Sequence, residues 1–162
     1  MSENQIISAD NKPEQVDCLL VPLKDRNLIL PNVTVAEVIP FSHLLTTNAS
    51  TDWVLGRLDW RGTLVPALCY ELMSGQAAPA PNPDARFIIV NGVNANPQMP
   101  FYAILVQGIP RLMHIGEHDL QEVEAMSMGQ FDKVAVTIEG VTAMIPDLDA
   151  LEDVFLTAGG TV

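Results

Sequence analysis

The sequence predicts an all-β protein with a barrel architecture. Short runs rich in valine, isoleucine and leucine recur along the chain and are separated by turn residues. Their spacing of roughly eight to twelve residues is typical of barrels and sandwiches. The strand–helix–strand alternation that builds a parallel α/β sheet does not occur. About ten short strands are therefore expected, with helices only as short connections and at the C-terminal end.

The composition fits one domain, or two small halves that share a core. Of the 162 residues, 48% are hydrophobic and 17% are charged, so apolar side chains suffice for a buried core. The 8 basic and 20 acidic residues give a formal net charge of −12, which would repel phosphate backbones and anionic membranes. We expect no nucleic-acid partner and no membrane insertion, whereas a partner with a basic or apolar surface is compatible with this charge.

The N-terminal sequence and the cysteines predict a cytoplasmic protein. The first residues lack the basic start and apolar core of a signal peptide, and no apolar run approaches the length of a membrane span. Cys18 and Cys69 are far apart, lie in apolar contexts and lack CxxC spacing. This pattern favours buried, reduced thiols over a disulfide.

The first part of the chain predicts a flexible tail followed by three strands. Residues 1–15 are polar and without period, which is typical of a tail. Strands are expected at residues 16–22, 28–31 and 32–40. In the third of these, apolar side chains fall on both faces and Glu37 lies at an edge. A polar connection over residues 41–52 leads to the next element.

Residues 53–72 predict a β-hairpin, and we expect function to centre on it. Leu58 and Trp60 alternate with Asp59 and Arg61, so the first strand presents one apolar face and one charged face. An arginine beside a rigid turn is unusual in so acidic a chain.

Local chemistry also predicts the turn and the end of this hairpin. Gly62-Thr63 is expected to form the turn, because glycine adopts the positive φ that hairpin turns need. The second strand is expected to end at Pro66, which lacks a ladder donor. A helix that starts at Ala67 is expected to stop at residues 74–75.

The second part of the chain repeats the strand-and-turn pattern after an extended connection. Residues 74–84 contain three prolines at alternate positions, which forbid a helix and favour an exposed segment. A boundary between two halves is therefore expected near this connection. Strands are expected at residues 86–91, 101–106, 109–115, 133–138 and 141–145.

The last elements are expected to be a hairpin turn and a capped helix. Glu139-Gly140 has the favoured chemistry of a two-residue turn. Asp147 is expected to cap a closing helix with one apolar face, while its remaining carboxylates, among them Glu152, form a solvated face. Residues 157–162 are expected to be a second flexible tail.

Two histidines raise the question of a metal site. His114 and His118 are four residues apart, and ligands at this spacing converge when they lie on a helix. Gly116 and the preceding β pattern favour a strand that passes into a loop instead. Neither a GxSxG elbow nor a phosphate-binding glycine loop occurs. We expect no catalytic residue, cofactor or metal; the alternative is a small β-barrel enzyme, or a metal- or small-molecule-binding protein, that uses His114, His118 or Cys69.

Arg61 has two interpretations, which the residues alone leave open. One is an exposed pair with Asp59, two positions earlier on the same strand face, which contributes only about 0–1 kcal/mol. The other is an interface anchor, because an arginine beside an aromatic side chain on a stiff hairpin is typical of residues that dominate protein–protein contacts.

Three segments of the chain resemble the CheW-like domain of bacterial chemosensory systems. They are VAEVIP at 35–40, LGRLDWRGTLVPALCYEL at 55–72 and FYAILVQGIPRLM at 101–113. Gly56, Arg61, Gly62 and Pro66 fall on the most specific part of the family pattern, and the match spans residues 16–156.

The resemblance implies two five-stranded SH3-like β-barrels on a shared core, with short connecting and C-terminal helices. Family members are non-catalytic cytoplasmic adaptors. They couple the cytoplasmic tip of a methyl-accepting chemoreceptor to the regulatory domain of a chemotaxis-type histidine kinase, and other CheW-like proteins are further expected partners. The partner-binding residues carried over by position are Val35, Glu37, Gly56, Asp59, Trp60, Arg61, Gly62, Ala103 and Leu105.

Several features depart from the family pattern. Asp59-Trp60 replaces the usual Asn-Leu, and Gln107 replaces the usual aspartate of the later strand. The proline-rich connection and the strong acidity are also unlike the central chemotaxis adaptor. Together they resemble an accessory adaptor of the ChpC or PilI type, which serves pilus-mediated twitching motility.

Overall fold

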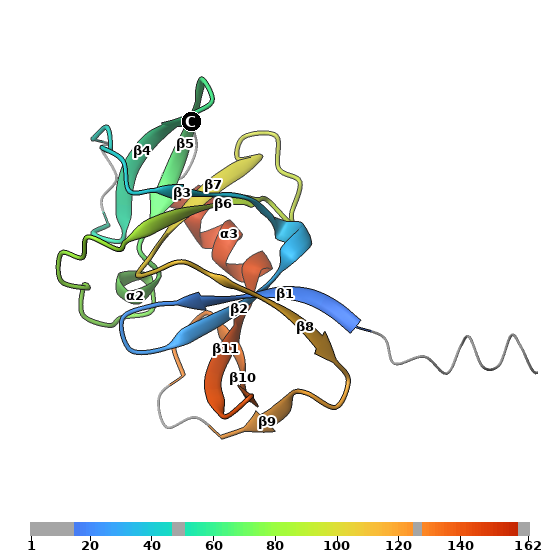
Figure 1. Ribbon diagram of the computed structural model, residues 1–162. Coiled ribbons are helices and arrows are strands. Elements are labelled where there is room, and N and C mark those ends of the chain that lie inside the picture. The colour runs from blue at the N-terminus through green and yellow to red at the C-terminus, as the bar shows by residue number, and fades with distance from the viewer. Residues whose placement is uncertain (1–14, 47–50, 125–127, 159–162) are drawn as a thin grey trace, which may run out of the picture.

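Two β-sheets and a few short helices make up the fold of the described residues, so the predicted all-β class is confirmed. Figure 1 shows the computed structural model, which describes residues 15–46, 51–124 and 128–158. The six-stranded sheet has the order β8-β1-β2-β11-β10-β9. Its strands are β1 (Gln15–Pro22), β2 (Asn27–Pro31), β8 (Arg111–Gly116), β9 (Gln121–Val123), β10 (Asp132–Ile138) and β11 (Val141–Pro146).

The five-stranded sheet has the order β3-β6-β7-β5-β4. Its strands are β3 (Val35–Pro40), β4 (Val54–Trp60), β5 (Thr63–Leu68), β6 (Arg86–Asn91) and β7 (Phe101–Val106). Three short or closing helices complete the fold: η1 (Asn32–Thr34), α2 (Tyr70–Met73) and α3 (Leu148–Thr157). The sheets therefore have six and five strands where five and five were expected, because the acidic segment before β10 contains the short strand β9.

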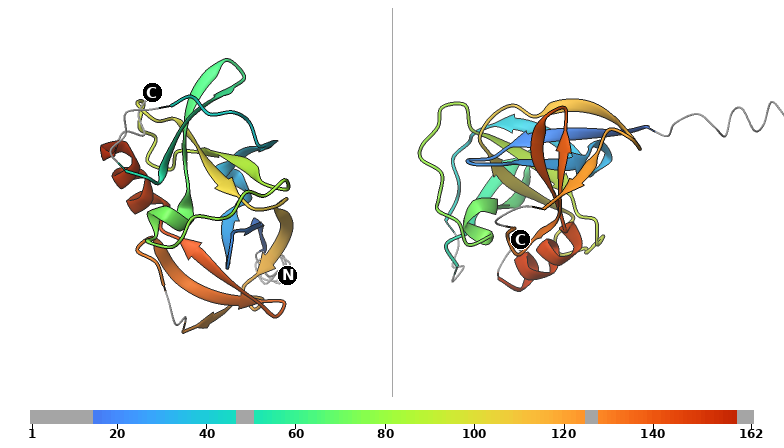
Figure 2. Two further views of the ribbon diagram at one scale, coloured as in Figure 1. Left: turned by 90° about the vertical axis from the view of Figure 1, so that its left-hand side faces the viewer. Right: turned by 90° about the horizontal axis from the view of Figure 1, so that it is seen from below.

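The two ends of the described chain build one sheet and its middle builds the other, as Figures 1 and 2 show. The chain changes sheets between β2 and β3 and again between β7 and β8. The proline-rich connection at 74–84 joins α2 to β6 and so lies inside the five-stranded half. The boundary between the two halves is therefore not at this connection, because the strands before and after it, β5 and β6, belong to the same sheet.

Three of the expected elements have different bounds. Residues 32–34 form the 3₁₀ turn η1 before β3, and Thr34 Oγ1–H donates to Pro31 C=O at 2.7 Å. β5 continues through Pro66 to Leu68, and the expected helix shrinks to α2. Pro66 is tolerated because it lies opposite Arg57 at a position where strand alternation turns the main-chain nitrogen away from β4.

Three apolar clusters hold the sheets together. One belongs to the six-stranded sheet and contains Cys18, Leu20, Ile29, Met113, Ile115, Val136, Ile138 and Ala143. A second belongs to the five-stranded sheet and contains Leu58, Val65, Ala67, Phe87, Ile89 and Ala103. The largest unites both sheets with α3, through residues such as Leu28, Ile88 and Phe155. The five-stranded sheet therefore packs on both faces, and its rigidity supports the surface described below.

α3 closes the shared core and is capped as expected. Asp147 Oδ1 accepts a hydrogen bond from Ala150 N–H at 3.1 Å. Glu152 is not on a solvated face, as had been expected, but is 1% exposed. Its carboxylate accepts hydrogen bonds from Tyr102 Oη–H at 2.8 Å and from Val93 N–H at 2.9 Å, which offset the cost of burying the charge. Across the described segments, no helix combines the length and apolarity that a bilayer crossing requires.

Candidate protein-docking site

The β4–β5 turn places Arg61 at the tip of the hairpin. Arg61 and Gly62 have φ angles of 52° and 81°, the type I′ geometry that two-residue hairpin turns favour. Gly62 N–H donates to Asp59 Oδ1 at 2.9 Å. The turn is Arg61-Gly62 and not the expected Gly62-Thr63, because Trp60 and Thr63 face each other as the last strand pair.

Arg61 pairs with Glu37 of β3. Its Nη2 donates to Glu37 Oε1 at 2.6 Å, and Trp60 Nε1–H donates to Glu37 Oε2 at 3.4 Å. β3 and β4 are the outermost strands of the five-stranded sheet, so these contacts join its two edges. The Arg61 side chain is 73% exposed, and such a pair adds only about 0–1 kcal/mol to stability. Its main consequence is that the guanidinium lies against the Glu37 carboxylate.

The guanidinium of Arg61 lies over the ring of Trp60. Arg61 Cζ lies 5.4 Å from the centre of the Trp60 ring, within the range of a cation–π contact. Trp60 meets Phe101 of β7 edge-on, with 5.0 Å between ring centres. An exposed guanidinium that is oriented by a carboxylate and backed by an aromatic ring suits protein recognition. The Arg61 surface comprises Glu37, Asp59, Trp60, Arg61 and Gly62.

Gly56 has a structural reason to be glycine. Its φ is +141°, and a Cβ built at this position would lie 2.3 Å from the carbonyl oxygen of Leu45. Leu45 and Arg57 exchange two main-chain hydrogen bonds of 2.7 and 2.9 Å. Gly56 therefore lets the segment after β3 lie directly on β4, and it affects the Arg61 surface through the backbone rather than by contact.

Two of the predicted partner-binding residues contribute to the apolar cores. Ala103 is 0% exposed and belongs to the core of the five-stranded half, so its side chain is not available to a partner, contrary to expectation. Alternation along β7 turns it toward that interior. Val35 is half-buried and packs against the shared core. Ala103 therefore shapes the sheet without offering its side chain, whereas Val35 keeps part of its surface exposed.

Leu105, by contrast, lines an apolar groove. The groove has a volume of about 530 Å³. Its lining, here named the Phe41 groove, is Phe41, Pro79, Ala80, Pro81, Asn82, Pro83, Ala85, Leu105 and Gln107. Phe41 is 54% exposed and stacks on Phe87 with 5.3 Å between ring centres. The signal missed in the sequence was the aromatic residue Phe41 directly after a strand, together with three alternating prolines later in the chain.

The connection that forms one wall of this groove is held in place. Asn82 Nδ2–H donates to Gln107 C=O at 2.9 Å, and Asp84 N–H donates to Asn82 Oδ1 at 2.9 Å. An extended proline-rich segment has little conformational freedom to lose. The Phe41 groove is thus a preformed surface on the same half as the Arg61 surface.

The histidines do not assemble a metal site. His114 lies on β8 and pairs across the sheet with Asp17 of β1, whereas His118 lies in the exposed loop after β8. Within residues 15–46, 51–124 and 128–158, no group of three or more histidine, cysteine or acidic side chains could hold a metal ion.

Cys69 is 1% exposed at the end of β5, and burial raises the pKa of its thiol to about 11. Burial likewise raises the pKa of the Cys18 thiol. A nucleophilic cysteine needs a lowered pKa and access to solvent, and neither thiol meets these conditions.

We expect both thiols to resist labelling in the folded protein. At pH 8 a thiol reagent should react with neither cysteine, whereas in denaturant it should react with both. Burial in the folded state favours the neutral form of the Cys69 thiol. The contribution of this thiol to the stability of the fold is therefore complete below the unfolded pKa of about 8.5, and it is lost as pH rises toward the folded pKa of about 11. Rapid stoichiometric labelling of the native chain would instead indicate an exposed, reactive cysteine.

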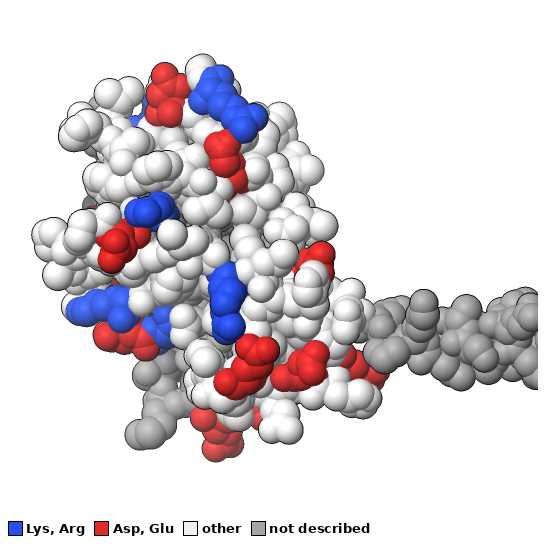
Figure 3. Space-filling model, in the orientation of Figure 1, with Lys and Arg blue, Asp and Glu red and all other residues white. Residues whose placement is uncertain are grey.

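Charge on the visible face of the molecule is uneven. Figure 3 shows acidic side chains gathered over the end formed by β8 and β9, while basic side chains are scattered singly over the rest of that face. The exposed acidic residues in that part of the chain are Glu117, Asp119, Glu122 and Glu124. Arg61 is thus an exposed cation, away from this acidic end, in a protein with a net charge of −12.

Comparisons with known proteins agree with this arrangement. A family model, described as the CheW-like domain, matches residues 17–154. A similar solved structure is the scaffolding protein TtCheW from Thermoanaerobacter tengcongensis, with a TM-score of 0.70 and 16% identity over 85% of this chain and 88% of that chain. The search of curated proteins returned no match. Since the family model covers most of its length, the chain belongs to the CheW-like domain family, whose members are non-catalytic adaptors of chemotaxis-type signalling.

Proposed function

We propose that this chain couples a chemoreceptor to a histidine kinase in the cytoplasm. Its partners would be the cytoplasmic tip of a methyl-accepting chemoreceptor and the regulatory domain of a chemotaxis-type kinase. The observation that carries the proposal is the Arg61 surface, where a 73% exposed guanidinium is fixed by Glu37 and Trp60 on a tight turn. Oriented arginines beside aromatic rings are frequent anchors of protein interfaces.

The two surfaces of the five-stranded half suit two kinds of partner. The Phe41 groove, apolar and about 530 Å³ in volume, suits the apolar face of an amphipathic helix such as a receptor tip presents. The Arg61 surface, polar and aromatic, suits a folded domain that presents carbonyl oxygens to the guanidinium. We assign the receptor to the groove and the kinase to the Arg61 surface.

The acidity and the proline-rich connection support an accessory adaptor of the ChpC or PilI type in a pilus-linked system. A net charge of −12 would select against acidic partners by long-range repulsion, and this selection weakens as salt rises. Other CheW-like proteins are a further class of partner in this proposal.

The experiment that tests the proposal is reconstitution of the chain with both purified partners. We expect one complex that contains all three proteins in size-exclusion chromatography with light scattering. Failure to bind either partner, or stoichiometric zinc or iron in the purified chain, would contradict the adaptor assignment.

A further inference from the structure

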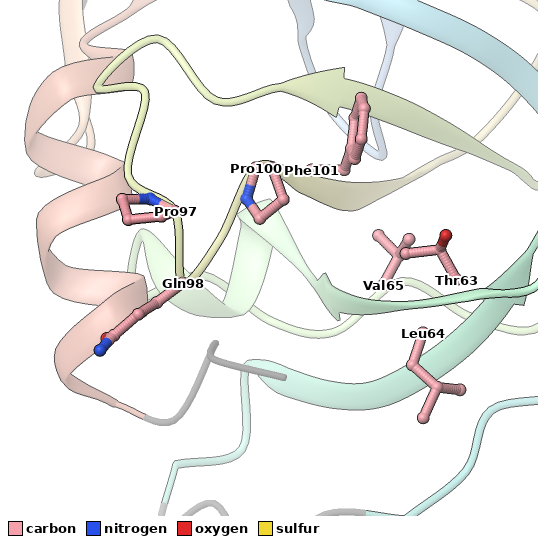
Figure 4. Close-up of a pocket in the computed structure, with 7 residues that line it drawn as sticks. All are labelled: Thr63, Leu64, Val65, Pro97, Gln98, Pro100 and Phe101. Atoms are coloured by element: carbon pink, nitrogen blue, oxygen red, sulfur yellow. The ribbon is translucent and has the colours of Figure 1, made fainter.

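A second cleft lies between β5 and β7, on a different side of the hairpin from Glu37. Figure 4 shows its lining residues, which come from the start of β5 and from the loop that enters β7. The cleft is about 440 Å³ in volume, and its lining, here named the Leu64 cleft, is Thr63, Leu64, Val65, Pro97, Gln98, Pro100 and Phe101. None of these side chains carries a charge.

The cleft exists because a parallel strand pairing stops early. β5 and β7 are paired only at Ala67–Ala103 and Leu68–Ile104. Continuation of this parallel ladder toward the strand starts would require residue 66 to donate its N–H to the carbonyl of Phe101. Residue 66 is proline, which has no N–H. The pairing therefore ends at Pro66, and the cleft lies beyond it.

The main chain on the two sides of the cleft keeps strand geometry. In a two-residue hairpin Trp60 and Thr63 bond to each other, so alternation turns the N–H and C=O of Leu64 away from β4 and toward the cleft. On the other side, Gly92 N–H donates to Pro100 C=O at 2.9 Å. The same alternation then turns the C=O of Phe101 away from β6. In the strand register of the described residues, the N–H of Leu64 and the C=O of Phe101 thus face the cleft, and neither group is paired with a neighbouring strand.

From these observations we infer that the Leu64 cleft binds an extended peptide segment of a partner protein. The segment accepts a hydrogen bond from Leu64 N–H, donates one to Phe101 C=O, and packs an apolar side chain against Pro97 and Pro100. The cleft volume of about 440 Å³ is that of roughly fifteen water molecules in the liquid, so a single bridging water does not fill the cleft. The uncharged lining favours main-chain recognition over an ionic ligand. This inference does not rest on the proposed adaptor function.

The inference can be tested with displayed peptides and two variants of the full chain. A phage library of random peptides of about twelve residues is panned on the purified chain, and enriched sequences are synthesised and titrated. Leu64→Pro deletes the cleft donor while sparing the β4 ladder, because that N–H faces away from β4. Gln98→Trp fills the cleft from an exposed loop position. Gln121→Trp, at an exposed position on β9, is the matched control.

We expect enriched peptides to bind about tenfold more weakly to Leu64→Pro and Gln98→Trp, and unchanged to Gln121→Trp. Amide exchange measured by NMR should be fast at Leu64 and slow at Val65 in the unbound chain, and slow at both with peptide. If Leu64→Pro does not fold, the peptide affinity of Gln98→Trp alone tests whether the cleft is the binding site. The inference is wrong if no peptide discriminates wild type from Gln98→Trp, or if the Leu64 amide is already protected in the unbound chain.

Discussion

Gly56→Ala should lower the free energy of unfolding by about 3 kcal/mol, the largest stability loss expected from a single added methyl group in this chain. A Cβ at this position would lie 2.3 Å from the Leu45 carbonyl oxygen, and φ is +141°. Backbone strain at a residue forced into such a conformation costs about 1–3 kcal/mol, and overpacking adds a similar amount. The segment after β3 must therefore move away from β4, or the strand must distort.

A matched control separates strain from crowding at Gly56. Gly75 also has a positive φ, +79°, but a Cβ there would have no neighbour within 4 Å. Gly75→Ala should therefore cost only the conformational strain, about 1–2 kcal/mol. Urea unfolding with a common m-value gives both losses. Equal losses in the two variants would show that the contact between residues 45 and 56 does not constrain the fold.

Arg61→Glu should weaken binding of the kinase regulatory domain by about a hundredfold, which corresponds to about 2.7 kcal/mol and is typical of an interface anchor. The substitution replaces an oriented cation by a carboxylate that faces Glu37. The attraction between the side chains of residues 61 and 37 then becomes a repulsion, and the guanidinium that anchors the partner is lost. Isothermal titration calorimetry measures the change.

Two further variants control for fold and for net charge. Arg61→Asn removes the guanidinium but should leave the turn at least as stable, because Asn-Gly is the preferred type I′ pair and asparagine tolerates positive φ. Arg111→Glu makes the same charge change at another exposed arginine, which pairs with Glu139 at 3.4 Å on the six-stranded sheet. If Arg111→Glu weakens kinase binding as much as Arg61→Glu does, the effect is general electrostatics and the anchor role of Arg61 is wrong.

Elements governed by local chemistry were predictable from the sequence. The Glu139-Gly140 turn has positive φ at both residues, and Asp147 caps α3, because each depends on side chains within a few positions. The hairpin at 54–68 was also predicted, although its turn was misplaced by one residue. Two-residue turns with arginine at the first position carry a weaker signal than Asn-Gly or Asp-Gly.

Features that depend on distant residues were not predictable. Glu37 and Arg61 are separated by 24 positions, and only closure of the five-stranded sheet brings them together. Glu152 looked like part of a solvated helix face, yet it is buried, and its carboxylate accepts hydrogen bonds from the β6–β7 loop and from Tyr102. Ala103 was carried over by position from the family pattern, and alternation along its strand could not correct this, because it does not reveal which face is outside when both faces pack. Local patterns describe the elements, while the sheet order decides which side chains meet.

The proposed adaptor holds a receptor and a kinase at the same time on two separate surfaces. The most direct test is calorimetric titration of a purified receptor tip into the chain, first alone and then with the kinase regulatory domain at saturation. We expect the receptor Kd to change by no more than about threefold between the two titrations, with one receptor site per chain in both. Complete loss of receptor binding in the presence of the kinase domain would show that the two partners compete for one surface, and the two-surface arrangement would then be wrong.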